Sequence, residues 1–174
     1  MENELILVDL TDKEIGFGEK LAVHQVGQLH RAFSVFVIHN GKMLIQRRAV
    51  SKYHSGGLWA NSCCSHPRRG EKLFGSARAR IREELGADIS ELEELFSFVY
   101  RCSFENGLTE YEYDHVLLAD YNGPVYPNPA EVECVKWVEL SELKQTMLEQ
   151  PEAFASWFII AAPRVMALLE ERNA

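Results

Sequence analysis

An Asn-Gly pair between two apolar, β-branched runs constrains the fold more than any other feature of the sequence. The runs cover residues 32–39 and 42–48, and the pair is Asn40-Gly41. Asn-Gly favours the left-handed backbone of a two-residue hairpin turn. We therefore expect an antiparallel β-hairpin here. Further strands are expected at residues 4–10, 94–104, 109–121 and 132–140.

Helical patterns follow and interleave with these strands. Residues 71–85 are rich in Ala, Arg and Glu, and Gly86 is a common helix end. Residues 152–173 are apolar at helical spacing, with a kink expected at Pro163. The alternation of helices with strands predicts an α/β fold. A short helix from a Ser141 cap to Glu149, a polar turn at residues 11–18 and a Pro-rich loop at residues 123–129 complete the expected layout.

Length and charge set the class of protein. The chain has 174 residues, of which 47% are hydrophobic, which suits one domain, residues 1–174. A net charge of −8 argues against nucleic-acid or anionic-membrane partners, because no broad basic field is available. We find no secretory signal, no apolar run of membrane-spanning length and no C-x-x-C pair among the four cysteines. The expected location is the cytoplasm, where thiols stay reduced.

The stretch LWANSCCSHP at residues 58–67 sets a thiol beside an imidazole. Successive side chains of a strand point to opposite faces, so Cys64 and His66 should share one face, with Cys63 and Ser65 on the other. This arrangement offers a nucleophile or acid next to a metal ligand.

A second extended stretch repeats this spacing with carboxylates. Glu110 and Glu112 should share a face, and Tyr111 and Tyr113 should share the other. Two adjacent carboxylates that face an apolar interior need a cation or a proton between them. On their own, such pairs are more often a solvated strand face.

His24 and His30 supply two more nitrogen donors ahead of the first hairpin strand. Three imidazoles and two carboxylates suit a divalent ion such as Zn, Mn, Fe or Mg. Taken singly, each of these histidines is more often a surface or core residue than a ligand.

Several motifs together carry a resemblance to a known family. They are N-S-x-C-S-H-P at residues 61–67, H-x5-H-x-A-F at 24–33, Q-R-R-A-x-S-K at 46–52, E-E-L-G at 83–86, Tyr100, and E-x-E at 110–112. From about residue 5 to about residue 167 the chain resembles the type I isopentenyl-diphosphate isomerases, a branch of the Nudix superfamily. The resemblance implies a Nudix-like α/β/α sandwich with a mixed β-sheet in a single domain.

The resemblance also implies an activity. Members of this family interconvert isopentenyl and dimethylallyl diphosphate for isoprenoid biosynthesis, by metal-dependent protonation and deprotonation through a tertiary carbocation. Cys64 and Glu112 correspond to the two proton-transfer groups, and Tyr100 to a residue that holds or relays the proton. Trp157 corresponds to a tryptophan that covers the isoprenoid carbons. Which of Cys64 and Glu112 protonates first stays open.

The resemblance implies two metals. His24, His30, His66, Glu110 and Glu112 correspond to the ligands of one divalent ion, Mn, Zn or Mg. Glu84 corresponds to a ligand of Mg²⁺ that is bound with the substrate diphosphate. No redox or nucleotide cofactor is implied.

Basic side chains supply the expected diphosphate site. By pattern alone, such a cluster at a strand end can equally be edge protection, and the resemblance favours phosphate binding. Guanidinium groups suit phosphate oxygens because they form paired, charge-assisted hydrogen bonds. The corresponding residues are Lys20, Arg48, Lys52 and Arg80.

Two other classes remain open. A Nudix pyrophosphohydrolase is disfavoured because, with the Nudix box aligned on Gly86, its Arg-Glu pair is replaced by Ala79-Arg80. A non-catalytic, metal-stabilised binding module would unfold on metal removal and would not need Cys64. The residues without a matching motif are taken as structural or surface positions: His39, His54, His115, Cys63, Cys102 and Cys134.

Overall fold

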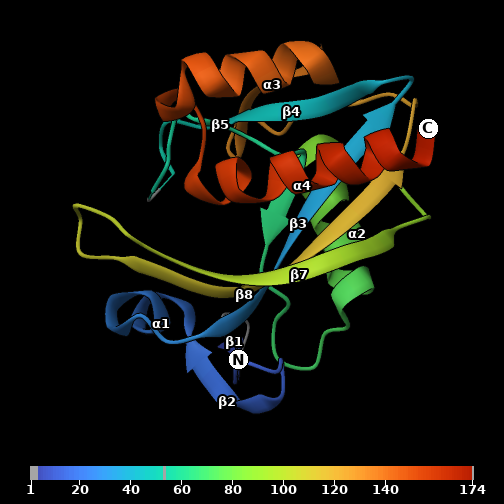
Figure 1. Cartoon of the computed structure of the whole chain (residues 1–174). Helices are drawn as coiled ribbons and strands as arrows, with labels where there is room; N and C mark the ends of the chain where they lie inside the picture. Colours follow the sequence, from blue (N-terminus) through green and yellow to red (C-terminus); the bar gives the residue numbers. More distant parts are fainter. Residues whose placement is uncertain (1–3, 53, 174) are drawn as a thin grey trace.

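The computed structural model describes residues 4–52 and 54–173. Within these ranges the strands belong to one mixed sheet that is covered by helices on both faces (Figure 1). This confirms the predicted α/β sandwich. The strands are β1 (Glu4–Val8), β2 (Glu14–Glu19), β3 (His30–His39), β4 (Lys42–Arg48), β5 (Trp59–Ala60), β6 (Cys63–Ser65), β7 (Glu93–Ser103), β8 (Thr109–Asp120) and β9 (Val132–Glu139). The helices are α1 (Lys20–Val26), α2 (Leu73–Leu85), α3 (Leu140–Glu149), the 3₁₀ turn η1 (Pro151–Ala153) and α4 (Ser156–Asn173).

The predicted hairpin is confirmed and organises the sheet. Asn40 and Gly41 have φ angles of 48° and 75°, as the tight turn requires. The two strands of the hairpin, β3 and β4, pair at three positions and then part. Strand β3 pairs in parallel with β8 and antiparallel with β6. Strand β4 pairs antiparallel with β5 and β9. The hairpin is therefore the point from which two arms of the sheet diverge (Figure 1).

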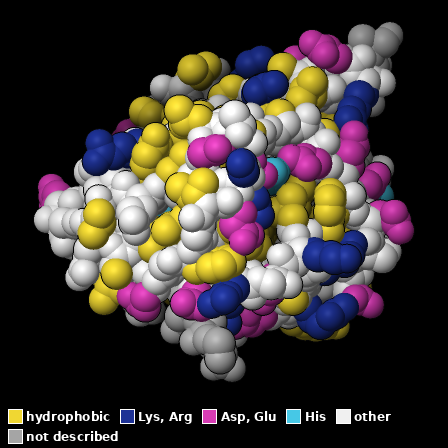
Figure 2. All heavy atoms as spheres, turned by 90° about the horizontal axis from the view of Figure 1, so that it is seen from below, with side chains coloured by type: hydrophobic (Ala, Val, Ile, Leu, Met, Phe, Trp, Pro, Cys, Tyr) yellow, Lys and Arg dark blue, Asp and Glu magenta, His cyan; other side chains and the backbone are white. Residues whose placement is uncertain are grey.

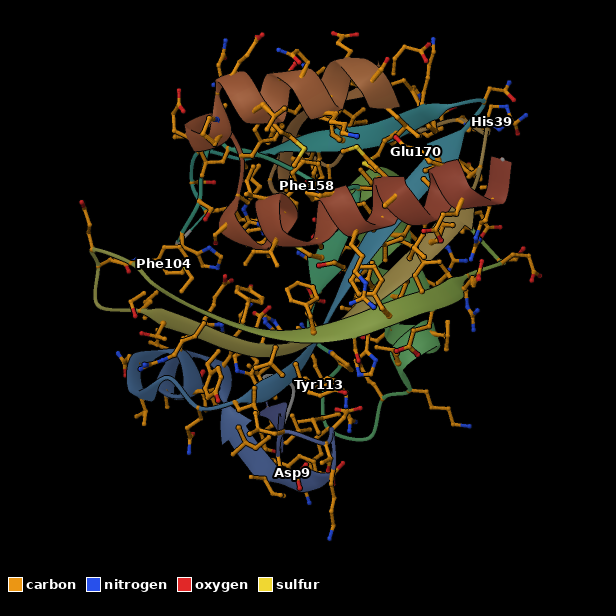
Figure 3. The ribbon with its side chains drawn as sticks, in the orientation of Figure 1. Asp9, His39, Phe104, Tyr113, Phe158 and Glu170 are labelled. Atoms are coloured by element: carbon orange, nitrogen blue, oxygen red, sulfur yellow. The ribbon has the colours of Figure 1, made fainter. Side chains whose placement is uncertain are left out.

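Alternate residues of β3 feed two separate cores. Phe33 and Val37 pack on one face with Ile81 of α2, and Phe36 packs on the other with Phe158 of α4. A central strand that is covered on both faces is apolar on both, which explains why residues 32–39 read as a continuous apolar run. Figure 3 shows Phe158 on the inner side of α4.

Two local predictions are wrong. Residues 14–19 form strand β2 against β1 instead of a polar turn, because the Asp9 carboxylate accepts from the backbone N–H groups of Thr11 (2.8 Å) and Lys13 (3.1 Å) and closes the turn early. Helix α3 begins at Leu140, not after a Ser141 cap. The backbone N–H of Leu140 donates to the carbonyl of Gly41, so the hairpin turn itself fixes this helix start.

The other helices end close to their predicted limits. Helix α2 stops at Gly86, whose φ of 58° is left-handed, as predicted. Its first residue is Leu73, two residues after the predicted start. In the C-terminal segment, η1 precedes α4, and α4 runs through Pro163 as one helix.

The surface carries mixed charge. On the face drawn in Figure 2, basic and acidic side chains are interspersed among apolar and neutral ones. Among the helices of the described residues, none combines the length and the apolarity that a membrane crossing requires.

Two matched glycine substitutions test the part played by the hairpin turn. Gly41→Ala should lower the free energy of unfolding by about 1 kcal/mol, because alanine is strained in the left-handed region. Gly75→Ala, at an exposed position inside α2 with no heavy atom within 4 Å of an added Cβ, should raise it by about 0.5 kcal/mol. Urea unfolding of both variants measures the difference. Equal effects of the two changes would contradict the assigned role of the turn.

Candidate active site and metal centre

One cavity brings together most of the predicted site residues. It lies between the diverging arms of the sheet, where β3, β6, β7 and β8 meet the start of α4. Predicted residues that line it are Lys20, Arg48, Lys52, Cys64, His66, Arg80, Tyr100, Glu110, Glu112 and Trp157. His24, His30 and Glu84 lie behind this lining, each buried.

Strand register aligns the reactive groups. Glu112 of β8 is paired with His30 of β3 on one side and with Tyr100 of β7 on the other. On β6, Cys64 is paired with Ser34 of β3. A side chain from each neighbouring strand thus faces the same end of the cavity.

Four side chains form a group that can hold a metal ion. The ligand atoms of His24, His30, His66 and Glu112 all lie within 4.8 Å of one another. Nδ1 of His24 lies 2.6 Å from the carbonyl of Lys20, and Nδ1 of His30 lies 2.8 Å from the carbonyl of Gln28. A carbonyl only accepts, so Nδ1 carries the proton in both rings and Nε2 offers its lone pair to a metal.

The charge state of this group also suits a cation. Burial lowers the pKa of His66 to about 3, despite the adjacent Glu112 carboxylate, and burial also lowers the pKa of His24. Burial alone would raise the pKa of Glu112, but His66 at 2.7 Å and His30 at 3.6 Å hold that pKa well below its usual range. Neutral imidazoles with one carboxylate are the forms that bind divalent metals.

Glu110, the fifth predicted ligand, faces the cavity but makes different contacts. Its Oε1 lies 2.8 Å from His54 Nε2, and its Oε2 lies 2.9 Å from the Tyr100 hydroxyl. That hydroxyl is also 2.8 Å from Glu112 Oε2, so Tyr100 bridges the two carboxylates. Burial and the negative charge of Glu112 raise the pKa of Glu110.

The two adjacent cysteines face opposite ways, as predicted. Cys63 packs in the core under α2, and Cys64 lies on the cavity side, 3.7 Å from Arg48 Nη1. Burial raises the pKa of the Cys64 thiol to about 12, although the Arg48 charge opposes this rise. Cys64 therefore keeps its proton at neutral pH.

Trp157 is held rigidly at the cavity wall. It is 2% exposed, its Nε1 donates to Asn61 Oδ1 at 2.9 Å, and the Arg48 guanidinium lies 5.1 Å from its ring centroid. The indole N–H is thus satisfied, which is usual for a buried tryptophan and leaves the ring as an apolar, electron-rich wall.

Basic side chains gather at the other end of the cavity. Burial, followed by the positive charges of Lys52 and Arg80, lowers the pKa of Lys20. Lys52 and Arg80 both contact the Glu131 carboxylate, Arg80 at 2.7 Å. An anion bound in the cavity would relieve the repulsion between Lys20 and these two side chains.

Glu84, the predicted Mg²⁺ ligand, is engaged within the protein. Its Oε1 lies 2.7 Å from Arg80 Nε, and its Oε2 accepts from Gln46 Nε2 at 3.0 Å. The carboxylate lies next to the basic end of the cavity, behind Arg80.

Sequence reasoning missed two residues of the site. His54 was assigned a structural or surface role, yet it lines the cavity and contacts Glu110. Glu131 lies in a loop far along the chain from the lysine and arginine that it contacts. The only available signal for His54 was its position two residues after Lys52, and for Glu131 there was none.

The depressed pKa of His66 predicts a pH dependence of stability in the metal-free protein. The imidazole stays neutral down to about pH 3 when folded but gains a proton below pH 6.5 when unfolded. The free energy of unfolding should therefore fall as the pH falls through this window, by up to about 1.4 kcal/mol per pH unit for this one imidazole. Urea unfolding between about pH 7 and about pH 5 measures it. A His66→Asn variant should lose less over the same range, and parallel profiles would contradict the assignment.

Comparisons with known proteins identify the family of the chain. The NUDIX domain profile matches residues 28–158. Isopentenyl-diphosphate Delta-isomerase 2 of Aromatoleum aromaticum is 48% identical over 168 residues, covering 96% of this chain and 88% of the relative. The isopentenyl-diphosphate Delta-isomerase of Burkholderia multivorans is 46% identical over 159 residues, covering 91% and 90%.

Solved structures support the fold. A crystal structure from Deinococcus radiodurans superposes with a TM-score of 0.76 at 20% identity, covering 92% of this chain and 98% of that one. A MutT NUDIX hydrolase from Burkholderia pseudomallei superposes with a TM-score of 0.65 at 21% identity, covering 79% and 98%. The NUDIX profile and the sequence identity to the curated relatives show that the chain belongs to the isopentenyl-diphosphate Delta-isomerase family of NUDIX-domain proteins.

Proposed function

We propose that this protein interconverts isopentenyl diphosphate and dimethylallyl diphosphate. The observation that carries the proposal is that Cys64 and the Tyr100-bridged Glu112 line one buried cavity with Trp157. Membership in the isomerase family agrees with it.

The reaction moves one carbon–carbon double bond. A proton adds to the terminal alkene carbon, the adjacent carbon becomes a tertiary cation, and loss of a proton from C2 forms the new double bond. Cys64 and Glu112 carry out the two transfers, and the Tyr100 hydroxyl, which donates to Glu112, helps to hold or relay the proton. The ring of Trp157 offers its electron-rich face to the cation.

The diphosphate occupies the basic end of the cavity. Lys20, Arg48, Lys52 and Arg80 supply the positive charge, with Mg²⁺ on Glu84. The lowered pKa of Lys20 supports this assignment, because burial lowers it first and the nearby positive charges of Lys52 and Arg80 lower it further.

A divalent metal, Mn, Zn or Mg, would be held by His24, His30, His66 and Glu112, with Glu110 as the fifth ligand. When bound, the ion supplies positive charge that stabilises the Glu112 carboxylate and fixes its orientation. The buried Nε2 atoms of His24 and His30 and the lowered pKa values of His24 and His66 support a metal at this position.

The structure gives little support to a pyrophosphohydrolase. Arg80 stands where the Nudix box has its metal-binding glutamate, and it pairs with Glu84 and Glu131. One of the positions that hold metal for hydrolysis thus carries a cation in this chain, although Glu84 is kept.

Adjacent cysteine substitutions separate chemistry from folding. Cys64→Ala should lower turnover in the interconversion assay by roughly 10²–10⁴-fold, the usual effect of losing a general acid or base. Cys63→Ala removes the same atom on the opposite face and should keep most of the activity, with a modest loss of stability. Equal losses of turnover that track a falling Tm would mean structural damage, and full activity in Cys64→Ala would leave Cys64 without a chemical role.

Metal content tests the ligand group directly. His66→Ala should lower the metal bound per chain, as measured by elemental analysis after dialysis, because the His66 imidazole belongs to the clustered group of candidate ligands. His39→Ala is the control, since His39 lies in an exposed pair with Asp120 at the far end of β3. Undiminished metal in His66→Ala would exclude this residue as a ligand.

A further inference from the structure

His54 is a buried histidine with defined contacts on several sides. The residue is 6% exposed, and its Nε2 lies 2.8 Å from Glu110 Oε1. A carboxylate accepts, so the geometry makes Nε2–H the donor. The backbone carbonyl oxygen of His54 also accepts from Nη2 of Arg48 at 3.4 Å.

Aromatic packing fixes the plane of the His54 ring. The ring of Phe104 stacks on it at a centroid distance of 4.6 Å and an angle of 17°, and Trp157 meets it edge-on at 5.9 Å and 89°. Figure 3 shows Phe104 beside the turn between β7 and β8. A ring that is held by two aromatic neighbours presents its N–H in one direction only.

This donor lies at one end of a chain of hydrogen bonds that leads to the reaction centre. His54 contacts Oε1 of Glu110, and the other oxygen of Glu110 contacts the Tyr100 hydroxyl. Tyr100 in turn contacts Glu112. Without His54, the Glu110 carboxylate would keep only the Tyr100 contact and could rotate away from it.

We propose that His54 is a positioning residue: it orients the Glu110 carboxylate and, through it, the Tyr100 hydroxyl at Glu112. The importance of Tyr100 and Glu112 in turnover comes from the proposed function, on which this inference rests. His54 lies outside the group of clustered metal ligands, so its effect passes through Glu110.

Four side chains at position 54 separate hydrogen bonding from packing. In His54→Gln the amide nitrogen reaches the place of Nε2, whereas in His54→Asn it does not, and His54→Phe keeps the aromatic stack without a donor. We expect kcat for the interconversion to fall about tenfold to 100-fold in the Asn and Phe variants, the range found when a supporting contact of a site is lost. KM should change by less than about threefold, and His54→Gln should keep most of the wild-type kcat.

The matched control is His39→Phe, which also removes a histidine bonded to a carboxylate, here Asp120 at 2.8 Å. It should leave kcat and KM unchanged. Wild-type kcat in His54→Phe, or equal losses in the Gln and Phe variants, would overturn the proposal.

Double variants test the path without relying on one substitution. In a Tyr100→Phe background, His54→Phe should lower kcat much less than in the wild type, because the group that it positions is gone. Effects that multiply would overturn the proposal.

A stability measurement keeps the inference separate from the proposed function. The urea midpoint of His54→Phe should fall in the wild-type background and fall less in a Glu110→Ala background, where no acceptor remains. Equal falls would overturn the contact. If the wild type does not interconvert the two diphosphates at all, the proposed function fails and this measurement still tests His54.

Discussion

The buried charge of Glu112 is the constraint on which the rest of the site depends. A carboxylate removed from water is costly unless charged or hydrogen-bonding groups surround it. Here His30, His66 and Tyr100 meet it from three different elements. These elements must therefore converge with the correct register, and the diverging arms of the sheet leave room for the cavity beside them.

The central position of β8 makes this convergence possible. The strand pairs in parallel with β3 and antiparallel with β7, so both neighbours contribute side chains at the level of Glu112. A slip by one residue would turn Glu110 and Glu112 to the opposite face and bring Tyr111 and Tyr113 into the cavity. The apolar residues of β8 resist such a slip because Val116 and Leu117 already fill separate cores.

The predictable parts of the molecule are those fixed by local rules. Asn40-Gly41 specified its hairpin, and the two-residue period placed Cys64 and Cys63 on opposite faces, because both rules act within a few residues. Strand β2 and the start of α3 were mispredicted because each depends on a backbone N–H that finds a specific acceptor. These acceptors are the Asp9 carboxylate for β2 and the Gly41 carbonyl for α3. The roles of His54 and Glu131 could not be predicted either, since each depends on a partner that folding alone brings near.

The cavity separates two kinds of environment that one site has to combine. Its basic end holds Lys20, Lys52 and Arg80 close enough for their charges to repel, which favours an anion. Trp157 and the thiol of Cys64, whose pKa burial raises, form another part of the wall, with the Arg48 guanidinium 3.7 Å from the Cys64 sulfur. A ligand with an anionic head and a hydrocarbon tail would place its head at the basic side chains and its tail beside Trp157 and Cys64. Under the proposed function, the basic side chains would hold the diphosphate, and the hydrocarbon part would lie beside the thiol and the Tyr100-bridged carboxylates.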